Sequence, residues 1–258
     1  MNIVSLQSHV AYGHVGNSAA TFAMQRLGHE VWPVYTVNFS NHTEYPDWGG
    51  PVMDPAQVKD VLDGFSFAFD QVDLVVTGYL GSPELAEVVR ETVTRIKAAN
   101  PQARYICDPV IGNEEVGSFV SPEMPDVFRE VLIPLADAIT PNEWELNLLG
   151  VDLPSRALIT SVGSDPLRMI DVSPEGTFCL STPRLGGNVV GAGDLATALY
   201  AAMFDEPARE RLGHLGATMF DFVNEVRTRN LPELPLIECQ ELLVRPRSSF
   251  DVVEVEYP

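Results

Sequence analysis

The sequence predicts an α/β fold in which a mostly parallel central sheet is covered by helices on both faces, as a three-layer sandwich. Short apolar runs alternate with segments of helical pattern from residue 3 to residue 149. The runs are apolar at successive positions, which is typical of parallel strands buried on both faces. Three later strand-like segments joined by turns predict an antiparallel edge on the same sheet.

The parallel part is expected to contain strands and helices in strict alternation. One helix is expected to end at Gly28 and another to carry Pro83 in its first turn, because glycine favours helix ends and proline helix starts. The expected strands are Ile3–Gln7, Glu30–Val37, Asp73–Thr77, Tyr105–Asp108 and Ala136–Thr140. The expected helices are Asn17–Leu27, Pro55–Phe65, Pro83–Asn100, Pro122–Ile133 and Asn142–Leu149.

The remaining part of the chain is expected to complete the sheet and add two helices. Turn residues at 163–165 and 173–176 separate its first strands. No repeat, linker or change of composition marks a boundary, so one domain over residues 1–258 is expected. The expected strands are Leu158–Val162, Arg168–Val172, Thr177–Leu180 and Phe250–Val255, and the expected helices are Leu195–Met203 and Glu206–Arg229.

Charge and cysteine content exclude several classes of function. The 16 basic and 36 acidic residues give a formal net charge of −20, which argues against a nucleic-acid or membrane partner. An anionic ligand would need a helix N-terminus, a metal ion or a few arginines. The cysteines at 107, 179 and 239 show no disulfide or zinc spacing. With no evident signal peptide, a cytoplasmic protein is expected.

The most informative segment is Gly191-Ala192-Gly193-Asp194, which precedes the apolar run Leu195–Met203. Small residues at a helix start allow backbone N–H groups to approach an anion. A carboxylate beside a phosphate is useful when it removes a proton from an attacking hydroxyl. The segment therefore suggests phosphoryl transfer to an alcohol. A tight turn with a charge that favours the helix dipole remains the alternative interpretation.

Polar side chains follow each strand of the expected parallel sheet. Because ligands bind at the carboxyl ends of such strands, these residues are expected to share one edge. Ser8, Asn41-His42-Thr43, Thr77-Gly78-Tyr79, Asp108 and Thr140-Pro141-Asn142 with Glu145 follow the strands in order. A strand-ending turn at Asp108 and a helix N-cap at Asn142 are the simpler interpretations.

Several blocks of the sequence resemble pyridoxal kinases, in the same order over most of the chain. The specific blocks are Gln7-Ser8-His9-Val10-x-Tyr12-Gly13-His14 and Phe39-Ser40-Asn41-His42-Thr43. Gly78-Tyr79-Leu80-Gly81-Ser82, Asp108-Pro109-Val110, Thr140-Pro141-Asn142-x-x-Glu145 and Gly191–Asp194 continue the match. The last motif is shared by the wider ribokinase-like superfamily, so the resemblance implies a ribokinase-like fold.

The resemblance also implies Mg²⁺-dependent transfer of the γ-phosphoryl group of ATP to the 5′-hydroxyl of pyridoxal, with pyridoxine and pyridoxamine as related acceptors. It implies that Asp194 is the catalytic base and that the N–H groups of Gly191, Ala192 and Gly193 stabilise the transferring group. The implied acceptor-binding residues are Ser8, Val37, Phe39, Thr43, Glu44, Tyr79 and Asp194.

The nucleotide side is implied by the same resemblance. Asp108 and Glu145 would bind Mg²⁺, and a K⁺ ion and a homodimer are further features that the family suggests. The implied ATP-binding residues are Asp108, Thr140, Asn142, Glu145, Thr160, Thr182, Pro183, Arg184 and Leu185. His9, His14 and His42 lack metal-ligand spacing and are expected to form hydrogen bonds or pack.

Two segments are shorter than the family pattern. Only Val151–Arg156 separates one helix from the next strand, and Leu185–Gly191 is brief. Either residues are deleted, or they are absent from the sequence as given; continuous backbone would mean a truncated nucleotide pocket and weaker ATP binding. Thr160 stands where some members carry a lysine. A hydroxymethylpyrimidine kinase and a non-catalytic vitamin-binding protein are the alternative functions.

Overall fold

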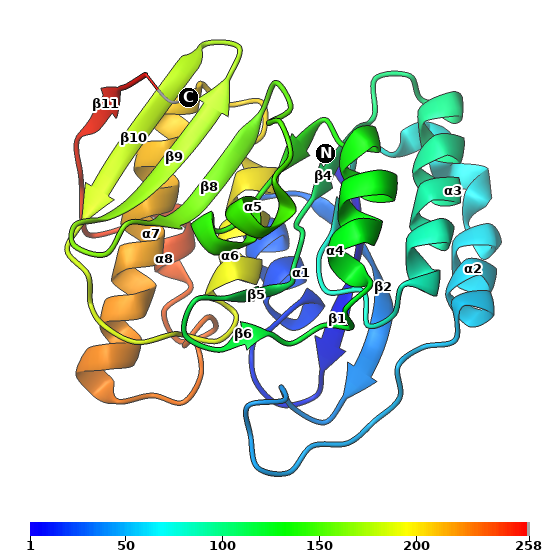
Figure 1. The fold of residues 1–258 in the computed structure, drawn as a ribbon, viewed down its shortest axis with the longest axis horizontal. Helices are drawn as coiled ribbons and strands as arrows, with labels where there is room; N and C mark the ends of the chain where they lie inside the picture. Colours follow the sequence, from blue (N-terminus) through cyan, green and yellow to red (C-terminus); the bar gives the residue numbers. More distant parts are fainter. Residues whose placement is uncertain (257–258) are drawn as a thin grey trace.

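Nine strands form one sheet in the order β11-β10-β9-β8-β7-β4-β3-β1-β2. The computed structural model describes residues 1–256 (Figure 1). The strands from β2 to β8 are mutually parallel, and β8 to β11 are antiparallel. The strands are β1 Asn2–Val10, β2 Glu30–Phe39, β3 Leu74–Thr77, β4 Arg104–Cys107, β7 Ala138–Ile139, β8 Ala157–Val162, β9 Leu167–Ser173, β10 Gly176–Thr182 and β11 Val252–Glu254.

Helices cover both faces of the sheet, and each face has its own apolar core. In β1, Ile3 contributes to one core whereas Val4 and Leu6 contribute to the other, as the alternation of side chains along a strand requires. Helices α1 Asn17–Arg26, α6 Ala192–Ala202, α7 Ala208–Arg229 and α8 Glu241–Val244 cover the first face. Helices α2 Pro55–Gly64, α3 Glu84–Ala99 and α4 Met124–Val127 cover the second (Figure 1).

The predicted fold class is confirmed, including the antiparallel edge. The helix predicted at Pro122–Ile133 is wrong as a single element, because α4 gives way to a π-helical turn at Phe128–Leu132 and a 3₁₀ turn at Ile133–Leu135. Pro134 has no N–H to donate to the preceding turn, so a regular α-helix cannot continue through it. The structure adds elements that were not predicted: a 3₁₀ turn at Ser66–Gln71, α8, and a hairpin of β5 Gly112–Asn113 and β6 Gly117–Ser118.

The two segments that are shorter than the family pattern lead into β8 and α6. Helix α5 (Glu143–Leu149) serves as the crossover between the parallel strands β7 and β8, which pair at Ile139 and Ala157. Gly150 ends α5 in the left-handed conformation, with φ 58°, so the chain turns directly toward β8. The connection from β10 to α6 runs over residues 183–191 and holds Gly186 and Gly187 at positive φ.

Candidate active site

The parallel strands bring the predicted polar residues to one edge of the sheet. Ser8 lies near the end of β1, Asp108 follows β4, and Thr140 follows β7. All three are buried, with exposed fractions of 8% for Ser8, 5% for Asp108 and 4% for Thr140. Because a buried polar side chain is costly unless it has a partner, each of these three needs a specific role or a hydrogen bond.

Asp108 is the centre of a buried cluster of acidic and hydroxyl groups. The Thr197 hydroxyl donates to Asp108 Oδ2 at 2.8 Å, and Thr197 Oγ1 lies 2.8 Å from Thr140 Oγ1. Burial raises the pKa of Asp108 well above its ordinary value, and the negative charges of Glu145 and Asp194 raise it further. The structure thus places Asp108 near two other predicted carboxylates, and within residues 1–256 no basic side chain forms a hydrogen bond or ion pair with it.

Glu145 is held by the start of α5 and by the loop after β4. It forms a capping box with Asn142, in which each side chain accepts the backbone N–H of the other residue. Its Oε1 also accepts the N–H groups of Ile111 at 2.8 Å and Gly112 at 3.1 Å. Burial raises the pKa of Glu145 to about 7, and these backbone donors oppose the rise. The N-cap interpretation of Asn142 is therefore confirmed alongside the position of Glu145 in the cluster.

The Gly191 turn presents backbone N–H groups at the start of α6. Gly191 has φ 82°, and a Cβ atom there would lie 2.1 Å from the carbonyl oxygen of His14, so only glycine fits. The structure differs from the expected set of donors at Ala192, whose N–H already donates to the Val189 carbonyl at 3.1 Å. Within residues 1–256, the N–H groups of Gly191 and Gly193 have no acceptor, so they remain available to an anion.

Asp194 lies in the first turn of α6, half-buried, and faces the loop that follows β1. The backbone N–H of Gly16 lies nearby and opposes the effect of burial. The net result raises the pKa of Asp194 to about 6. A Cβ atom at Gly16 would lie 2.1 Å from Ser8 Oγ. Gly16 therefore lies between Ser8 and Asp194. The order of the sequence blocks does not reveal this arrangement.

An apolar cluster lies next to this turn. Val37 and Phe39 are buried in it together with Val10 and Val15, and Tyr79 and Val190 pack against it. Val190 immediately precedes the Gly191 turn. The structure therefore brings three of the predicted acceptor-binding residues, Val37, Phe39 and Tyr79, to the side of the predicted phosphate site.

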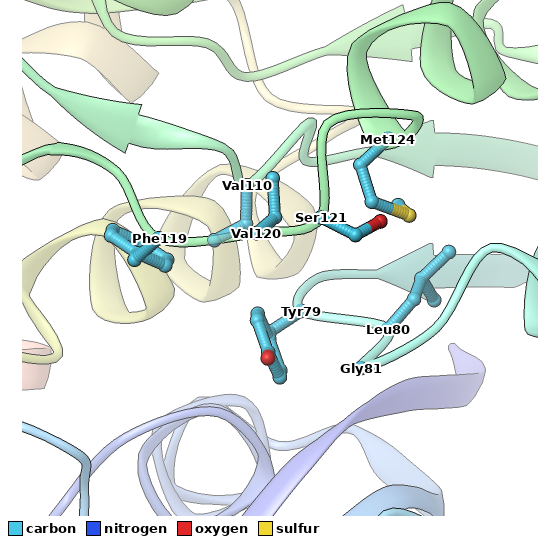
Figure 2. A pocket seen from close by; sticks show the side chains of 8 residues that line it. All are labelled: Tyr79, Leu80, Gly81, Val110, Phe119, Val120, Ser121 and Met124. Atoms are coloured by element: carbon cyan, nitrogen blue, oxygen red, sulfur yellow. The ribbon is translucent and has the colours of Figure 1, made fainter.

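A small pocket opens beside Tyr79. Figure 2 shows the Tyr79 ring on one side of it and the segment from Phe119 to Met124 on the other. Tyr79 lies 6.5 Å from Phe119 between ring centroids, and its carbonyl accepts the Thr36 hydroxyl at 2.6 Å. Asp108 and Asp194 do not line this pocket, so it extends the apolar side of the site rather than the carboxylate cluster.

Thr43 and Glu44 lie on an exposed loop after β2, and the Glu44 carboxylate accepts the Asn188 side-chain amide at 3.3 Å. Asn188 is fixed further by Arg227, which donates to its carbonyl at 2.8 Å. The short connection before the Gly191 turn is thus attached to the loop predicted to bind the acceptor. Within residues 1–256, the Thr43 side chain forms no hydrogen bond with another residue, whereas Glu44 does.

The predicted ATP-binding residues fall into two groups. Thr160 donates its backbone N–H to the Pro141 carbonyl at 3.0 Å, which places it beside Asn142 and the start of α5. Arg184 forms an ion pair with Glu115 of the β5–β6 turn at 3.1 Å. Thr182, Pro183 and Leu185 adjoin Arg184 in the chain, and within residues 1–256 no hydrogen bond connects them to the carboxylates.

Two of the three histidines, His9 and His42, form hydrogen bonds and pack on aromatic rings, as expected. His9 stacks on Tyr35 with 4.2 Å between ring centroids, and His42 Nε2 lies 3.1 Å from Glu233 Oε1. Sequence analysis missed Thr197 and Glu233. Thr197 stands three residues after Asp194 on one helix, a spacing that places both on one face and could have indicated it. Glu233 follows a helix in an irregular segment and carries no comparable signal.

Known proteins resemble this chain over nearly its whole length. A family model described as phosphomethylpyrimidine kinase matches residues 51–165. Pyridoxal kinase PdxY of Corynebacterium diphtheriae is 42% identical over 282 residues, which cover 99% of this chain and all of the relative. The chain belongs to the pyridoxal kinase family. The PdxY protein of Leifsonia xyli subsp. xyli is 40% identical, again over 282 residues and 99% of this chain. Family membership makes the chain a kinase that transfers phosphate from ATP to an alcohol group.

Solved structures of the family share the fold. Pyridoxal kinase from Leishmania donovani in complex with ADP and pyridoxamine has a TM-score of 0.89 and 27% identity, with 99% of each chain covered. The complex of that kinase with ADP and pyridoxine has a TM-score of 0.89 and 26% identity. The alignments with the two PdxY relatives run over 282 residues, whereas this chain has 258. The relatives thus contain internal residues with no counterpart here, in agreement with the two short segments.

Proposed function

We propose that this chain transfers the γ-phosphoryl group of ATP to the 5′-hydroxyl of pyridoxal, with pyridoxine and pyridoxamine as related acceptors, in the salvage of vitamin B6. The observation that carries the proposal is the position of Asp194. Its carboxylate stands at a helix start beside free backbone N–H groups and next to the apolar cluster of Val37, Phe39 and Tyr79. A base, an anion site and a ring-sized apolar surface therefore adjoin one another.

Asp194 acts as the base that receives the proton of the acceptor hydroxyl. A pKa of about 6 leaves it ionised at neutral pH and brings it closer to the operating pH than an ordinary aspartate. The nearby Gly16 N–H favours the ionised form of its carboxylate, which is the form that can accept the proton. The N–H groups of Gly191 and Gly193 stabilise the negative charge on the phosphoryl group as the attacking oxygen approaches.

The acceptor is held on the other side of the turn. Tyr79 stacks on the pyridine ring, while Val37 and Phe39 supply the apolar wall. Ser8 hydrogen-bonds the ring edge from beside Gly16, and Thr43 and Glu44 border the site from the loop after β2. The attachment of Glu44 to Asn188 supports this assignment, because it brings that loop to the segment that precedes Gly191.

Asp108 and Glu145 belong to the nucleotide side, together with Thr140, Asn142, Thr160 and residues 182–185. Within the described chain, no three His, Cys, Asp or Glu side chains lie close enough to hold a metal ion by themselves. Kinase sites bind Mg²⁺ through one or two carboxylates plus phosphates and water, so this donor set fits. Mg²⁺ would neutralise charge on the phosphates, with Asp108 as its direct ligand. Glu145 already accepts three N–H groups and would act through water.

Several further properties stay predictions. They are the use of K⁺, a homodimeric assembly, a cytoplasmic location and the organisation of residues 1–258 as one domain. In the part of the chain that the structure describes, no helix combines the length and apolar character needed to cross a membrane. The short segment before Gly191 predicts a higher KM for ATP than in the longer relatives, because less of the chain is available to cover the nucleotide.

The test is an ADP-release assay on the purified protein with each B6 vitamer and with hydroxymethylpyrimidine. The second acceptor is included because the matching family model is that of phosphomethylpyrimidine kinases. We expect ATP-dependent phosphorylation of pyridoxal, confirmed by detection of pyridoxal 5′-phosphate. Faster turnover of hydroxymethylpyrimidine would reassign the acceptor. Binding of pyridoxal with no ADP release would support a non-catalytic vitamin-binding protein.

A further inference from the structure

The carboxylate of Glu233 joins three segments that are far apart in the sequence. Its Oε2 accepts the backbone N–H of His14 at 3.1 Å. Its Oε1 accepts the Tyr45 hydroxyl at 2.9 Å and lies 3.1 Å from His42 Nε2. The Glu233 side chain is only 12% exposed, so these contacts form largely out of water. A nearly buried carboxylate with three donors from two loops constrains both loops together.

The first of these loops supports the Gly191 turn. A Cβ atom at Gly13 would lie 2.6 Å from Glu233 Oε2, so Gly13 allows the carboxylate to approach the backbone. The next residue, His14, places its carbonyl oxygen against Gly191, and Leu234 packs on the same glycine. A series of contacts therefore connects Glu233, through the His14 backbone, to Gly191, the first residue of the predicted phosphate site.

The second loop supports the predicted acceptor site. His42 and Tyr45 lie on either side of Thr43 and Glu44, and both contact the same oxygen of Glu233. The two rings also pack on each other, with centroids 4.5 Å apart. Thr43 and Glu44 thus occupy the middle of a short loop that is fixed at both ends by a single carboxylate.

We propose that Glu233 is a positioning residue that holds the acceptor-binding loop at residues 42–45 in register with the Gly191 turn. The inference rests on the proposed function for its kinetic consequence. Glu233 touches neither the reacting atoms nor the carboxylate cluster, and it acts through His14 on one side and through His42 and Tyr45 on the other. Its loss leaves three partly buried donors without their acceptor, so both loops move toward water and the acceptor is bound less well.

The kinetic test compares Glu233→Ala with Glu233→Gln and with Glu238→Ala, an exposed glutamate of the same segment. We expect Glu233→Ala to raise KM for pyridoxal by about tenfold, as for the loss of a hydrogen bond to a charged group, and to change KM for ATP by less than about twofold. Glu233→Gln should restore most of the affinity, because its carbonyl can accept the His14 N–H while its amide donates to His42 or Tyr45. Glu238→Ala should resemble the wild type.

Hydrogen exchange of the peptides that cover residues 9–16 and 40–48 tests the same proposal without turnover. Faster exchange of both peptides in Glu233→Ala, but not in Glu238→Ala, supports it. Unchanged exchange, an equal rise of KM for both substrates, or a Glu233→Gln variant as impaired as Glu233→Ala would overturn it. A wild-type protein that does not phosphorylate pyridoxal would refute the proposed function alone, and the exchange data would then decide the role of Glu233.

Discussion

Asp171 and Asp108 lie in two buried regions of this molecule that differ in how the negative charge is matched. Asp171 in β9 and Arg211 in α7 are both fully buried and form two parallel hydrogen bonds, of 2.8 and 2.9 Å. Arg211 also lies over the Tyr200 ring, 5.0 Å from its centroid, and donates to two backbone carbonyls. Asp108, by contrast, accepts a hydrogen bond from a threonine hydroxyl, and its charged neighbours are the carboxylates of Glu145 and Asp194.

The causes of the pKa shifts of the two aspartates differ in the same way. Burial raises the pKa of both Asp171 and Asp108. The Arg211 guanidinium opposes this rise at Asp171, whereas at Asp108 the two neighbouring carboxylates add to it. The ion pair of Asp171 and Arg211 therefore stabilises the fold, whereas carboxylates without a basic partner indicate a site that binds a cation. Each region predicts its own response to substitution.

The largest expected effect is on stability, from Asp171→Asn. The substitution leaves the Arg211 charge buried without its partner, which costs about 3–5 kcal/mol. For a chain of this size we expect Tm to fall by roughly 10 °C, while turnover well below Tm stays close to the wild-type value. Thermal unfolding measures the change, with Asp251→Asn on the surface as the matched control. A change in Tm no greater than that of the control would contradict the assigned role of the pair.

The next effect is on turnover, from Asp194→Asn. The amide keeps the shape of the side chain but cannot remove a proton, so we expect kcat to fall by about 10³-fold with little change in Tm. Steady-state ADP release with saturating pyridoxal measures it, and Asp205→Asn, on the surface after the same helix, is the control. Turnover within a few-fold of the wild type would remove Asp194 from the role of base.

The architecture was predictable because buried parallel strands are apolar at every position and glycine and proline mark helix ends. The strand at Ile3–Gln7 is therefore confirmed within the longer β1, and the helix at Pro83–Asn100 within two residues. The segment after Pro122 was not, because its apolar pattern is helical although Pro134 interrupts the hydrogen bonding. The apolar pattern of a segment predicts whether it is helical or extended, but it does not predict which type of helical turn forms.

The site was predictable where a residue lies in a motif or at a strand end. Asp108, Glu145 and Asp194 are such residues, and their convergence follows from the parallel topology. Glu233 contacts residues more than 180 positions away, as its hydrogen bonds to His14 and His42 show, so no local spacing reveals it. The hydrogen bond from the Ala192 N–H to the Val189 carbonyl likewise could not be predicted, because it depends on the conformation of the turn and not on its composition.

A smaller and opposite effect on stability is expected for Asp108→Asn. The amide removes a buried charge that two carboxylates repel, so the protein without ligands should gain on the order of 1–2 kcal/mol at neutral pH. Because folding raises the pKa of Asp108, the folded wild type binds this proton more readily than the unfolded chain does. The stability difference between the variant and the wild type should therefore shrink as pH falls toward the pKa that Asp108 has in the unfolded chain. Urea unfolding at pH 7 and pH 4 measures the difference, and ADP release should be lost. A variant less stable than the wild type at pH 7 would contradict the idea of an unmatched charge.

The pH dependence of catalysis should report the raised pKa of Asp194. Since this pKa lies at about 6, kcat/KM for pyridoxal should be level above pH 7 and decline below pH 6 by about tenfold per unit as the base becomes protonated. The same profile measured with pyridoxine separates titration of the enzyme from that of the aldehyde substrate. A decline that begins only near pH 4 would show that Asp194 titrates as an ordinary aspartate.

The smallest effect expected in this comparison is that of Thr197. Its hydroxyl is the hydrogen-bond donor to Asp108, whereas the donor to Asp171 is an arginine. Thr197→Val keeps the shape but removes the donor to Asp108 Oδ2 and the contact with Thr140. A typical hydrogen bond contributes about 1 kcal/mol net, so we expect kcat/KM to fall by roughly fivefold. Thr197→Ser, which retains the hydroxyl, should recover most of this loss. If valine and serine reduce kcat/KM equally, the methyl packing of Thr197 matters for activity and its hydroxyl does not.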